Sequence, residues 1–325
     1  MSLTDRRRAT APGEWNFHTC SRCTAAFLDP RPTAAAGLMR GAPPLRHPHT
    51  PGWLTRQARR LTVALRNGYV NRRTDQRLRP AYRLGYWWHV WRPRSRARIH
   101  AELGWLPAGR PHRRLLDVGG QSPQAVGAAR SSGWRVTVVL PDHRRPALLD
   151  MPDADVHVGS VADAGLSQGS FDLINVQGAL ERMHRPLEEL EACARLLRPG
   201  GTIRISTPNL ASLGHRHYRR HWSALDPPRN LVLFTAASLD RLLGSAGFSA
   251  THTRDVPLGA RQSFRDSEEL TTGRWSSPRY WLRRASIELK ALFADACALL
   301  RPDWGERLVV TARPVSSATT VPVAA

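Results

Sequence analysis

The sequence predicts an α/β protein with a doubly wound sheet, preceded by a helical, arginine-rich extension. Three observations support this fold class. Short apolar runs alternate with helix-length amphipathic segments between residues 111 and 314. The first of these runs, "LLDVGG", ends in an acidic residue and a glycine pair, as the first strand of a nucleotide-binding sheet does. The arginines are concentrated before residue 115.

The elements expected within this sheet follow one another in a regular order. We expect strands at 113–120, 134–142, 154–160, 171–180, 202–209 and 306–314, and helices at 124–133, 186–197 and 236–247. "RPGG" and Gly247 should end the second and third helices, because glycine readily adopts the conformation that closes a helix C-terminus. Strands and helices alternating at this spacing predict parallel pairing with right-handed crossovers.

We divide the chain into four parts. These are a vestigial half zinc ribbon at 1–35, a helical Arg/Trp-rich extension at 36–110, the α/β domain at 111–314 and a disordered tail at 315–325. Cys20 and Cys23 have the spacing of one half of a zinc ribbon, but a structural zinc site needs four ligands. We therefore expect no metal. Cys193 and Cys297 are the remaining cysteines, and all four should be reduced thiols.

The net charge of +22 is unevenly distributed. Residues 1–114 contain 23 arginines against five acidic residues, a surplus of 18 positive charges. This surplus fits a coding bias toward arginine, and it also fits contacts with phosphates. No apolar run is long enough to span a membrane, and the N-terminus lacks the apolar core of a secretory signal, so we expect a cytoplasmic protein.

The extension at 36–110 has helical periodicity and an aromatic cluster. Apolar residues recur at helical spacing among arginines after residue 53, which predicts one or two amphipathic helices. Tyr86, Trp87, Trp88 and Trp91 follow. We expect these rings to pack the extension onto the main domain. The alternatives are stacking on bases, contact with a membrane surface, and a lid over an apolar pocket.

Four blocks of the sequence together resemble a known family. They lie at 115–120, 171–209, 221–248 and 305–314. They resemble the class I S-adenosylmethionine-dependent methyltransferases, in particular the ubiquinone-biosynthesis O-methyltransferases. "CSRCTAAFLDPRPT" resembles the end of the zinc-ribbon segment that many of these proteins carry. The resemblance implies a seven-stranded, Rossmann-like methyltransferase sheet, S-adenosyl-L-methionine as cofactor and a small-molecule substrate.

The resemblance also implies where the cofactor binds. Asp117, Gly119 and Gly120 fall where the family has an acidic residue and the start of a glycine loop. Gln121 and Pro123 replace the second and third glycines of that loop. Proline fixes its own φ and lacks a backbone donor, so this loop must differ from the family's.

Other cofactor positions match the family in part. Leu140 occupies the usual position of the ribose-binding acid, and Asp142 follows it either as a substitute or as a turn residue. Asp163 follows the third strand, where the family contacts the adenine amino group; it could equally cap a turn. Asn175 and Gln177 end the fourth strand at the edge where ligands bind.

Methyl transfer to a hydroxyl needs a base as well as correct positioning. Arg182 replaces a histidine of the family, and Asn230 stands where the family has another. The candidate bases lie after the fifth strand and are His217, His221 and Asp226, with His215 beside them. The same cluster could be a solvated loop.

Three functions remain open on the sequence alone. The first is methylation of a small molecule, such as a hydroxyl of a lipid-like or secondary-metabolite acceptor. The second is a degenerate methyltransferase fold that has lost its cofactor and acts as a partner or regulatory subunit. The third is a nucleic-acid-binding or nucleic-acid-modifying protein that uses the N-terminal arginines, although the sequence contains no recognition helix or RNA-binding signature.

Overall fold

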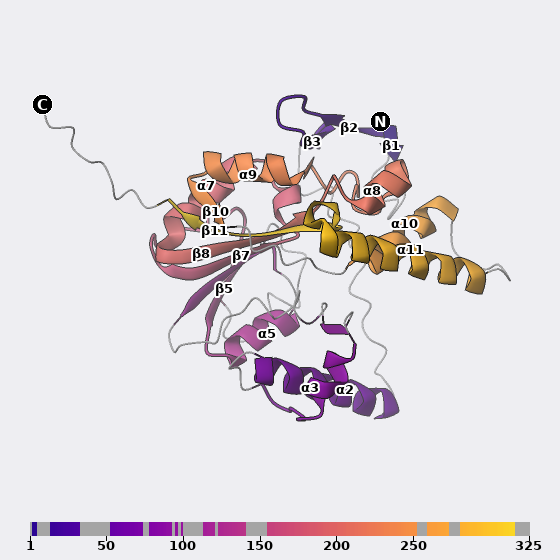
Figure 1. The fold of residues 1–325 in the computed structure, drawn as a ribbon. Coiled ribbons are helices and arrows are strands. Elements are labelled where there is room, and N and C mark those ends of the chain that lie inside the picture. Colours follow the sequence, from indigo (N-terminus) through magenta and orange to yellow (C-terminus); the bar gives the residue numbers. More distant parts are fainter. Residues whose placement is uncertain are drawn as a thin grey trace, which may run out of the picture.

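A computed structural model describes residues 2–4, 14–32, 53–73, 78–92, 95–96, 99, 113–120, 123–140, 155–251, 259–272 and 280–315. Its centre is a seven-stranded sheet of order β10-β11-β8-β7-β4-β5-β6 (Figure 1). The strands are β4 (Arg114–Val118), β5 (Arg135–Leu140), β6 (Asp155–Val158), β7 (Phe171–Gln177), β8 (Leu197–Pro208), β10 (Phe248–Thr251) and β11 (Arg307–Pro314). This confirms the predicted fold class.

Five of the seven strands are parallel, as expected. β4 pairs in parallel with β5 and β7, β5 with β6, and β7 with β8. The expectation is wrong for β11, which runs antiparallel between β8 and β10. The chain enters β11 at the edge of the sheet where β8 ends, since Arg307 at the start of β11 pairs with Pro208 at the end of β8. β11 therefore runs in the opposite direction to β8.

The two faces of the sheet are covered by different helices. Leu115 and Leu173 join an apolar cluster with α2 and α5, whereas their neighbours Leu116 and Ile174 join a second cluster with α7 and α9. Successive strand residues point to opposite faces, so both layers have a core. The helices are α2 (Trp53–Arg73), α5 (Pro123–Ser131), α7 (Pro186–Leu196) and α9 (Ala236–Ser245).

The "RPGG" sequence does not act as a separate helix terminator. α7 ends at Leu196 and β8 begins at once with Leu197, so "RPGG" lies inside a twelve-residue strand. Gly200 has a φ of +77°, which glycine accepts without strain. The predicted strand at 202–209 is therefore the second part of a longer one.

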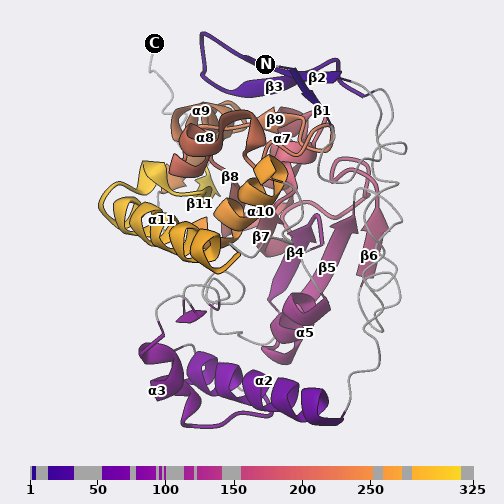
Figure 2. The same cartoon turned by 90° about the vertical axis from the view of Figure 1, so that its right-hand side faces the viewer.

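The N-terminal segment forms a small sheet of its own. β2 (Glu14–Thr19) and β3 (Ala26–Asp29) form a hairpin with Cys20 and Cys23 at its turn, and β1 (Ser2–Thr4) pairs with β2. β3 also pairs with β9 (Val232–Leu233), which attaches the hairpin to the main domain on the side opposite α2 (Figure 2). Backbone hydrogen bonds lower the pKa of the Cys20 thiol.

The extension contains the helices that the sequence predicts. α2 and the segment that contains the shorter α3 (Gly85–Val90) pack closely at glycines, since a Cβ at Gly68 would lie 1.8 Å from the carbonyl oxygen of Tyr82, just before α3. Of the aromatic cluster, Tyr86 packs as expected: it stacks on Tyr69 of α2 and joins the apolar cluster that α2 shares with β4 and α5. Trp87, Trp88 and Trp91 are exposed, because the buried face of α3 carries Gly85 and His89 instead.

Two helices lie between β10 and β11 that the sequence analysis did not predict. They are α10 (Ala260–Thr272) and α11 (Tyr280–Leu300), and they pack on each other and on α8 (Leu213–Tyr218). Asp295 of α11 accepts a hydrogen bond from the backbone N–H of Ala260 at 3.1 Å. No helix in the described part of the chain is long and apolar enough to cross a membrane.

Candidate active site

A cavity of about 470 Å³ opens at the carboxyl end of the central strands. Binding sites of doubly wound sheets lie at this edge, and the volume suits a small organic molecule. Its walls come from the ends of β4, β5, β6 and β7, from the turn η2 (Leu180–Arg182) and from the start of α7. The polar and charged residues that line it are Ser160, Asp163, Arg182, His184, Arg185, Glu188 and Glu189.

Gly119 allows two strand ends to approach each other at the cavity floor. Its φ is +95°, and a Cβ there would lie 2.6 Å from the Cβ of Ala179. Real side chains do not tolerate so close a contact, so this position requires glycine. Gly120 is buried and also has a positive φ, of +60°. Gln121 lies outside the described residues.

The departure at Pro123 has a local explanation. Pro123 is the first residue of α5. Proline is favoured at this position because the first helical N–H has no partner within the helix and because the ring fixes a helical φ. The replacement of the family's glycine by proline is therefore compatible with a regular helix start.

Asp117 and Asn175 lie next to each other behind the cavity. They are paired in register on β4 and β7, both are buried, and Asn175 Nδ2 donates to Asp117 Oδ1 at 2.9 Å. Both lie at the carboxyl edge of the sheet, and their contact with the cofactor stays a prediction. Neither residue lines the cavity itself, and nor does Gln177, at the end of β7.

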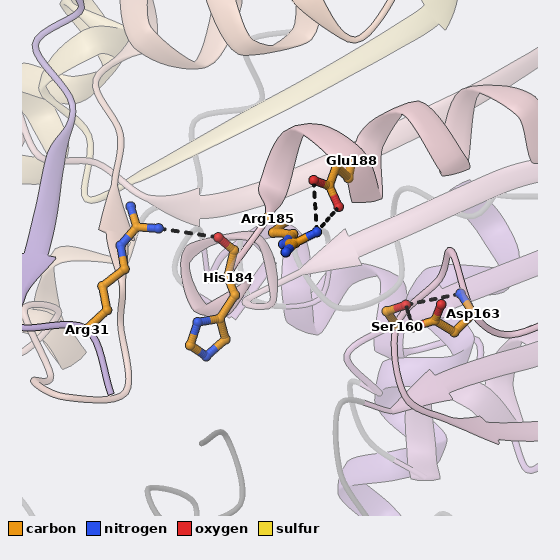
Figure 3. A network of polar contacts seen from close by, with 6 residues as sticks. All are labelled: Arg31, Ser160, Asp163, His184, Arg185 and Glu188. Atoms are coloured by element: carbon orange, nitrogen blue, oxygen red, sulfur yellow. Dashed lines mark hydrogen bonds and ion pairs between the residues drawn. The ribbon is translucent and has the colours of Figure 1, made fainter. Parts of the chain in front are cut away.

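The loop after β6 forms one acidic wall of the cavity. Ser160 Oγ donates to Asp163 Oδ2 at 2.6 Å and accepts from the backbone N–H of Asp163 at 3.0 Å (Figure 3). The backbone N–H of Val161 donates to Glu189 Oε2 at 2.8 Å, and burial raises the pKa of Glu189. Asp163 therefore closes a turn and also lines the cavity, and its contact with adenine stays a prediction.

Basic groups form the opposite rim. Arg182, His184 and Arg185 line the cavity, and Arg185 pairs with Glu188 at 3.2 Å. Arg31, from the N-terminal segment, donates to the carbonyl oxygen of His184 at 3.4 Å (Figure 3). The sequence analysis did not identify His184, Arg185, Glu188 or Glu189. Their position after β7, where the chain crosses the carboxyl edge, is the signal that could have revealed them.

The position of the family's ribose-binding acid is occupied by an apolar side chain. Leu140 is fully buried at the end of β5. Its hydrocarbon side chain has no hydrogen-bond acceptor, so it cannot bind the hydroxyl groups of a ribose. Asp142 lies outside the described residues. The carboxylates that line the cavity belong to Asp163, Glu188 and Glu189.

The expected bases lie outside the cavity wall. His217 of α8 stacks on the ring of Phe264, with Nε2 at 3.4 Å from Lys290 Nζ. Burial, and then the charge of Lys290, lower its pKa. His221 is half-buried in the following turn η3 (Arg219–His221). His184 is the histidine that lines the cavity.

Asp226 forms a buried ion pair with Arg229. It is buried, and its Oδ1 accepts from Nη2 of Arg229 at 2.7 Å and from Nε at 3.0 Å. A carboxylate held in a buried ion pair fixes its loop and is poorly placed to take a proton from a substrate. This ion pair holds the loop that precedes Asn230, and the role of Asp226 as a base stays a prediction that the geometry does not support.

Comparison with known proteins identifies the family of this chain. A sequence profile described as a methyltransferase domain matches residues 76–253. A ubiquinone biosynthesis O-methyltransferase of Xanthomonas campestris pv. campestris is 37% identical over 106 residues, which are 30% of this chain and 44% of that protein. A probable S-adenosylmethionine-dependent methyltransferase of Mycolicibacterium smegmatis is 31% identical over 109 residues, which are 34% of this chain and 40% of that protein.

These matches span less than half the length of either relative. Among solved structures, an S-adenosylmethionine-dependent methyltransferase from Mesorhizobium loti is 17% identical, with a TM-score of 0.45 over 67% of this chain and 97% of that one. The methyltransferase domain profile covers more than half of the chain. The chain therefore belongs to the methyltransferase domain family, whose class I members use S-adenosylmethionine as their cofactor.

Proposed function

We propose that this protein transfers a methyl group from S-adenosylmethionine to a hydroxyl group of a small molecule. The observation that carries the proposal is the cavity at the carboxyl edge of β4, β5 and β7, with Gly119 at its floor and Asp163 in its wall. The residues present fit the cofactor, because a Cβ at Gly119 would block the approach of the two strand ends, and because the volume suits a nucleoside-sized ligand.

Each part of the wall has a proposed task in holding the cofactor. S-adenosylmethionine supplies an electrophilic methyl group on sulfur. Gly119 would bring the backbone close to the ligand, and Asp163 would accept a hydrogen bond from the adenine amino group. Asp117 would act indirectly, since the hydrogen bond that it accepts from Asn175 fixes the end of β4 beside the cofactor. Gln121 and Asp142 stay proposed contacts on the sequence alone.

We propose His184 as the base for a hydroxyl acceptor, because it lines the cavity. An imidazole nitrogen facing a bound acceptor could take the proton of its hydroxyl group. His217 and His221 remain proposed bases that would need a substrate reaching beyond the cavity wall. Arg182, whose Nε is 3.4 Å from Asn230 Oδ1, would contribute to placing the acceptor.

The name of the Xanthomonas relative supports a hydroxyl acceptor. That protein is an O-methyltransferase of ubiquinone biosynthesis, so its acceptor is a small molecule. We extend the reaction type and the size class of the acceptor to this chain. The buried Leu140 favours one competing function, a methyltransferase fold without cofactor that serves as a partner subunit, because it removes the usual acid for the ribose.

The proposal is tested with methyl-tritiated S-adenosylmethionine and, as the acceptor source, a whole-cell lysate that keeps its low-mass metabolites. We expect label in an organic-soluble, low-mass product that survives mild alkali, since methyl ethers resist hydrolysis and methyl esters do not. A His184→Gln variant should lose most of this transfer while still binding S-adenosylhomocysteine. Label found only in protein or RNA would contradict the proposal, and no transfer without cofactor binding would favour the partner subunit.

A further inference from the structure

Helix α3 and its flanks present a surface that methyl transfer does not use. We call it the Trp/Arg surface, and it consists of Arg79, Tyr82, Arg83, Leu84, Trp87, Trp88, Trp91 and Arg92, all exposed. Trp91 is 80% exposed, Leu84 73% and Trp87 55%. Large apolar side chains gathered so densely on a protein surface mark a binding site.

The surface is held rigidly from below. Gly85 lies against the backbone of α2, where an added Cβ would be 1.9 Å from the carbonyl oxygen of Leu65. Tyr86 stacks on the buried Tyr69, and His89 shares a 2.9 Å hydrogen bond with Ser95. The tryptophans therefore project from a fixed base, and their exposure does not come from a loose end of the chain.

The charge around these tryptophans has one sign. Between residues 53 and 99, the residues that the structure describes include ten arginines and no Asp or Glu. Arg92 lies over the ring of Trp88, 4.0 Å from its centre, and Arg72 lies over Tyr86 at 4.7 Å. Such a surface is complementary to a layer of negative charge that also accepts apolar groups.

The arrangement favours lipid over nucleic acid. Stacking on bases needs free ring faces, but Arg92 covers one face of Trp88. Trp87 already makes an edge-to-face contact with Tyr86, with the ring centres 5.3 Å apart. Leu84, the second most exposed apolar side chain here, has no ring to stack. Tryptophan, leucine and arginine side by side are the composition of helices that lie in a membrane interface.

We propose that the Trp/Arg surface docks the protein on an anionic membrane surface. Trp87, Trp91 and Leu84 enter the boundary between headgroups and acyl chains, while the arginines contact lipid phosphates. The inference is independent of the proposed methyl transfer, because α3 contributes no residue to the cavity.

The test uses the full-length protein and flotation with two kinds of vesicle, phosphatidylcholine alone and phosphatidylcholine with 30% phosphatidylglycerol. We expect binding to the anionic vesicles at physiological salt. A Trp87→Ser/Trp91→Ser variant should lose at least tenfold of this affinity, and Arg79→Gln/Arg83→Gln should lose a similar amount. The control is Leu289→Ser/Phe293→Ser on α11, which removes two equally exposed apolar side chains from another helix and should bind like the wild type.

Circular dichroism establishes that each variant is folded, which the exposure of the substituted residues leads us to expect. Three results would overturn the proposal: no binding to anionic vesicles by the wild type, binding that the tryptophan variant retains in full, or binding to single-stranded RNA that the same tryptophans support while vesicles are ignored. Loss of vesicle binding in the tryptophan variant together with retention in the α11 control supports it.

Discussion

Asn175 Nδ2 donates a hydrogen bond to Asp117 Oδ1 at 2.9 Å, and both side chains are buried between neighbouring strands at the carboxyl edge of the sheet. The pair links β7 to β4 directly beneath Gly119, which lines the cavity. The relationship gives Asp117 a structural reason for its position, in addition to the role that the family resemblance implies for it.

Breaking this pair should cost stability. Asn175→Ala leaves a buried carboxylate without one of its donors, so the free energy of unfolding should fall by about 1–3 kcal/mol. Urea unfolding of Asn175→Ala, Asp117→Ala and the double variant measures the coupling. If the two single effects simply add, the hydrogen bond has no energetic role and the prediction is wrong.

Gly119→Ala should weaken binding of S-adenosylhomocysteine by at least tenfold. The new Cβ meets the Cβ of Ala179 at 2.6 Å, which displaces the two strand ends that form the cavity floor. Gly133→Ala is the matched control, because Gly133 also has a positive φ, of +88°, but a Cβ there touches nothing. The control should lose about 1–2 kcal/mol of stability and keep its affinity. Equal affinities in the two variants would contradict the role of Gly119.

Glu306 should make stability depend on pH. Its buried carboxylate accepts hydrogen bonds from Ser263, Trp222 and Gly214, yet burial is the larger effect and raises its pKa above 4.5. A carboxyl whose pKa is higher when folded stabilises the protein below its unfolded pKa, and this contribution is lost as the pH rises through the folded value. The wild type should therefore lose stability relative to Glu306→Gln as the pH rises above 4.5. A difference that does not change with pH in urea unfolding would refute this.

Asp226→Ala should destabilise the protein without changing the pH dependence of methyl transfer. The substitution removes the carboxylate that pairs with the buried guanidinium of Arg229 at 2.7 Å, and breaking a buried ion pair costs about 3–5 kcal/mol. Thermal unfolding measures the loss, and Arg229→Ala should give one of similar size. Disappearance of a titrating limb from the rate profile of folded Asp226→Ala would instead restore Asp226 as the base.

The strands of the sheet could be predicted from the sequence because strands buried on both faces appear as continuous apolar runs. Leu115 and Leu116 face opposite cores, which gives the continuous apolar run that identified β4. It missed α10 and α11, partly because α11 exposes Leu289, Leu292 and Phe293, so its apolar residues do not form a single stripe. The direction of β11 depends on where those helices return the chain, which local patterns do not encode.

The site was predictable where it depends on strand ends. Asp117 and Asn175 could be grouped because parallel strands place their carboxyl ends together. The position of His184 and Glu189 after β7 places them near this edge, but which of their side chains enter the cavity wall depends on how η2 and α7 fold over the edge. The exposure of Trp87 and Trp91 could not be predicted either, because composition does not distinguish a buried aromatic cluster from an exposed one.

The most direct test of the central claim is isothermal titration of the full chain with S-adenosylmethionine and with S-adenosylhomocysteine. The cavity beside Gly119 and Asp163 predicts saturable binding in the micromolar range, about −8 kcal/mol, weakened by Gly119→Ala and unchanged by Gly133→Ala. No heat at millimolar ligand, from protein shown by circular dichroism to be folded, would contradict the claim that this cavity binds the methyl donor.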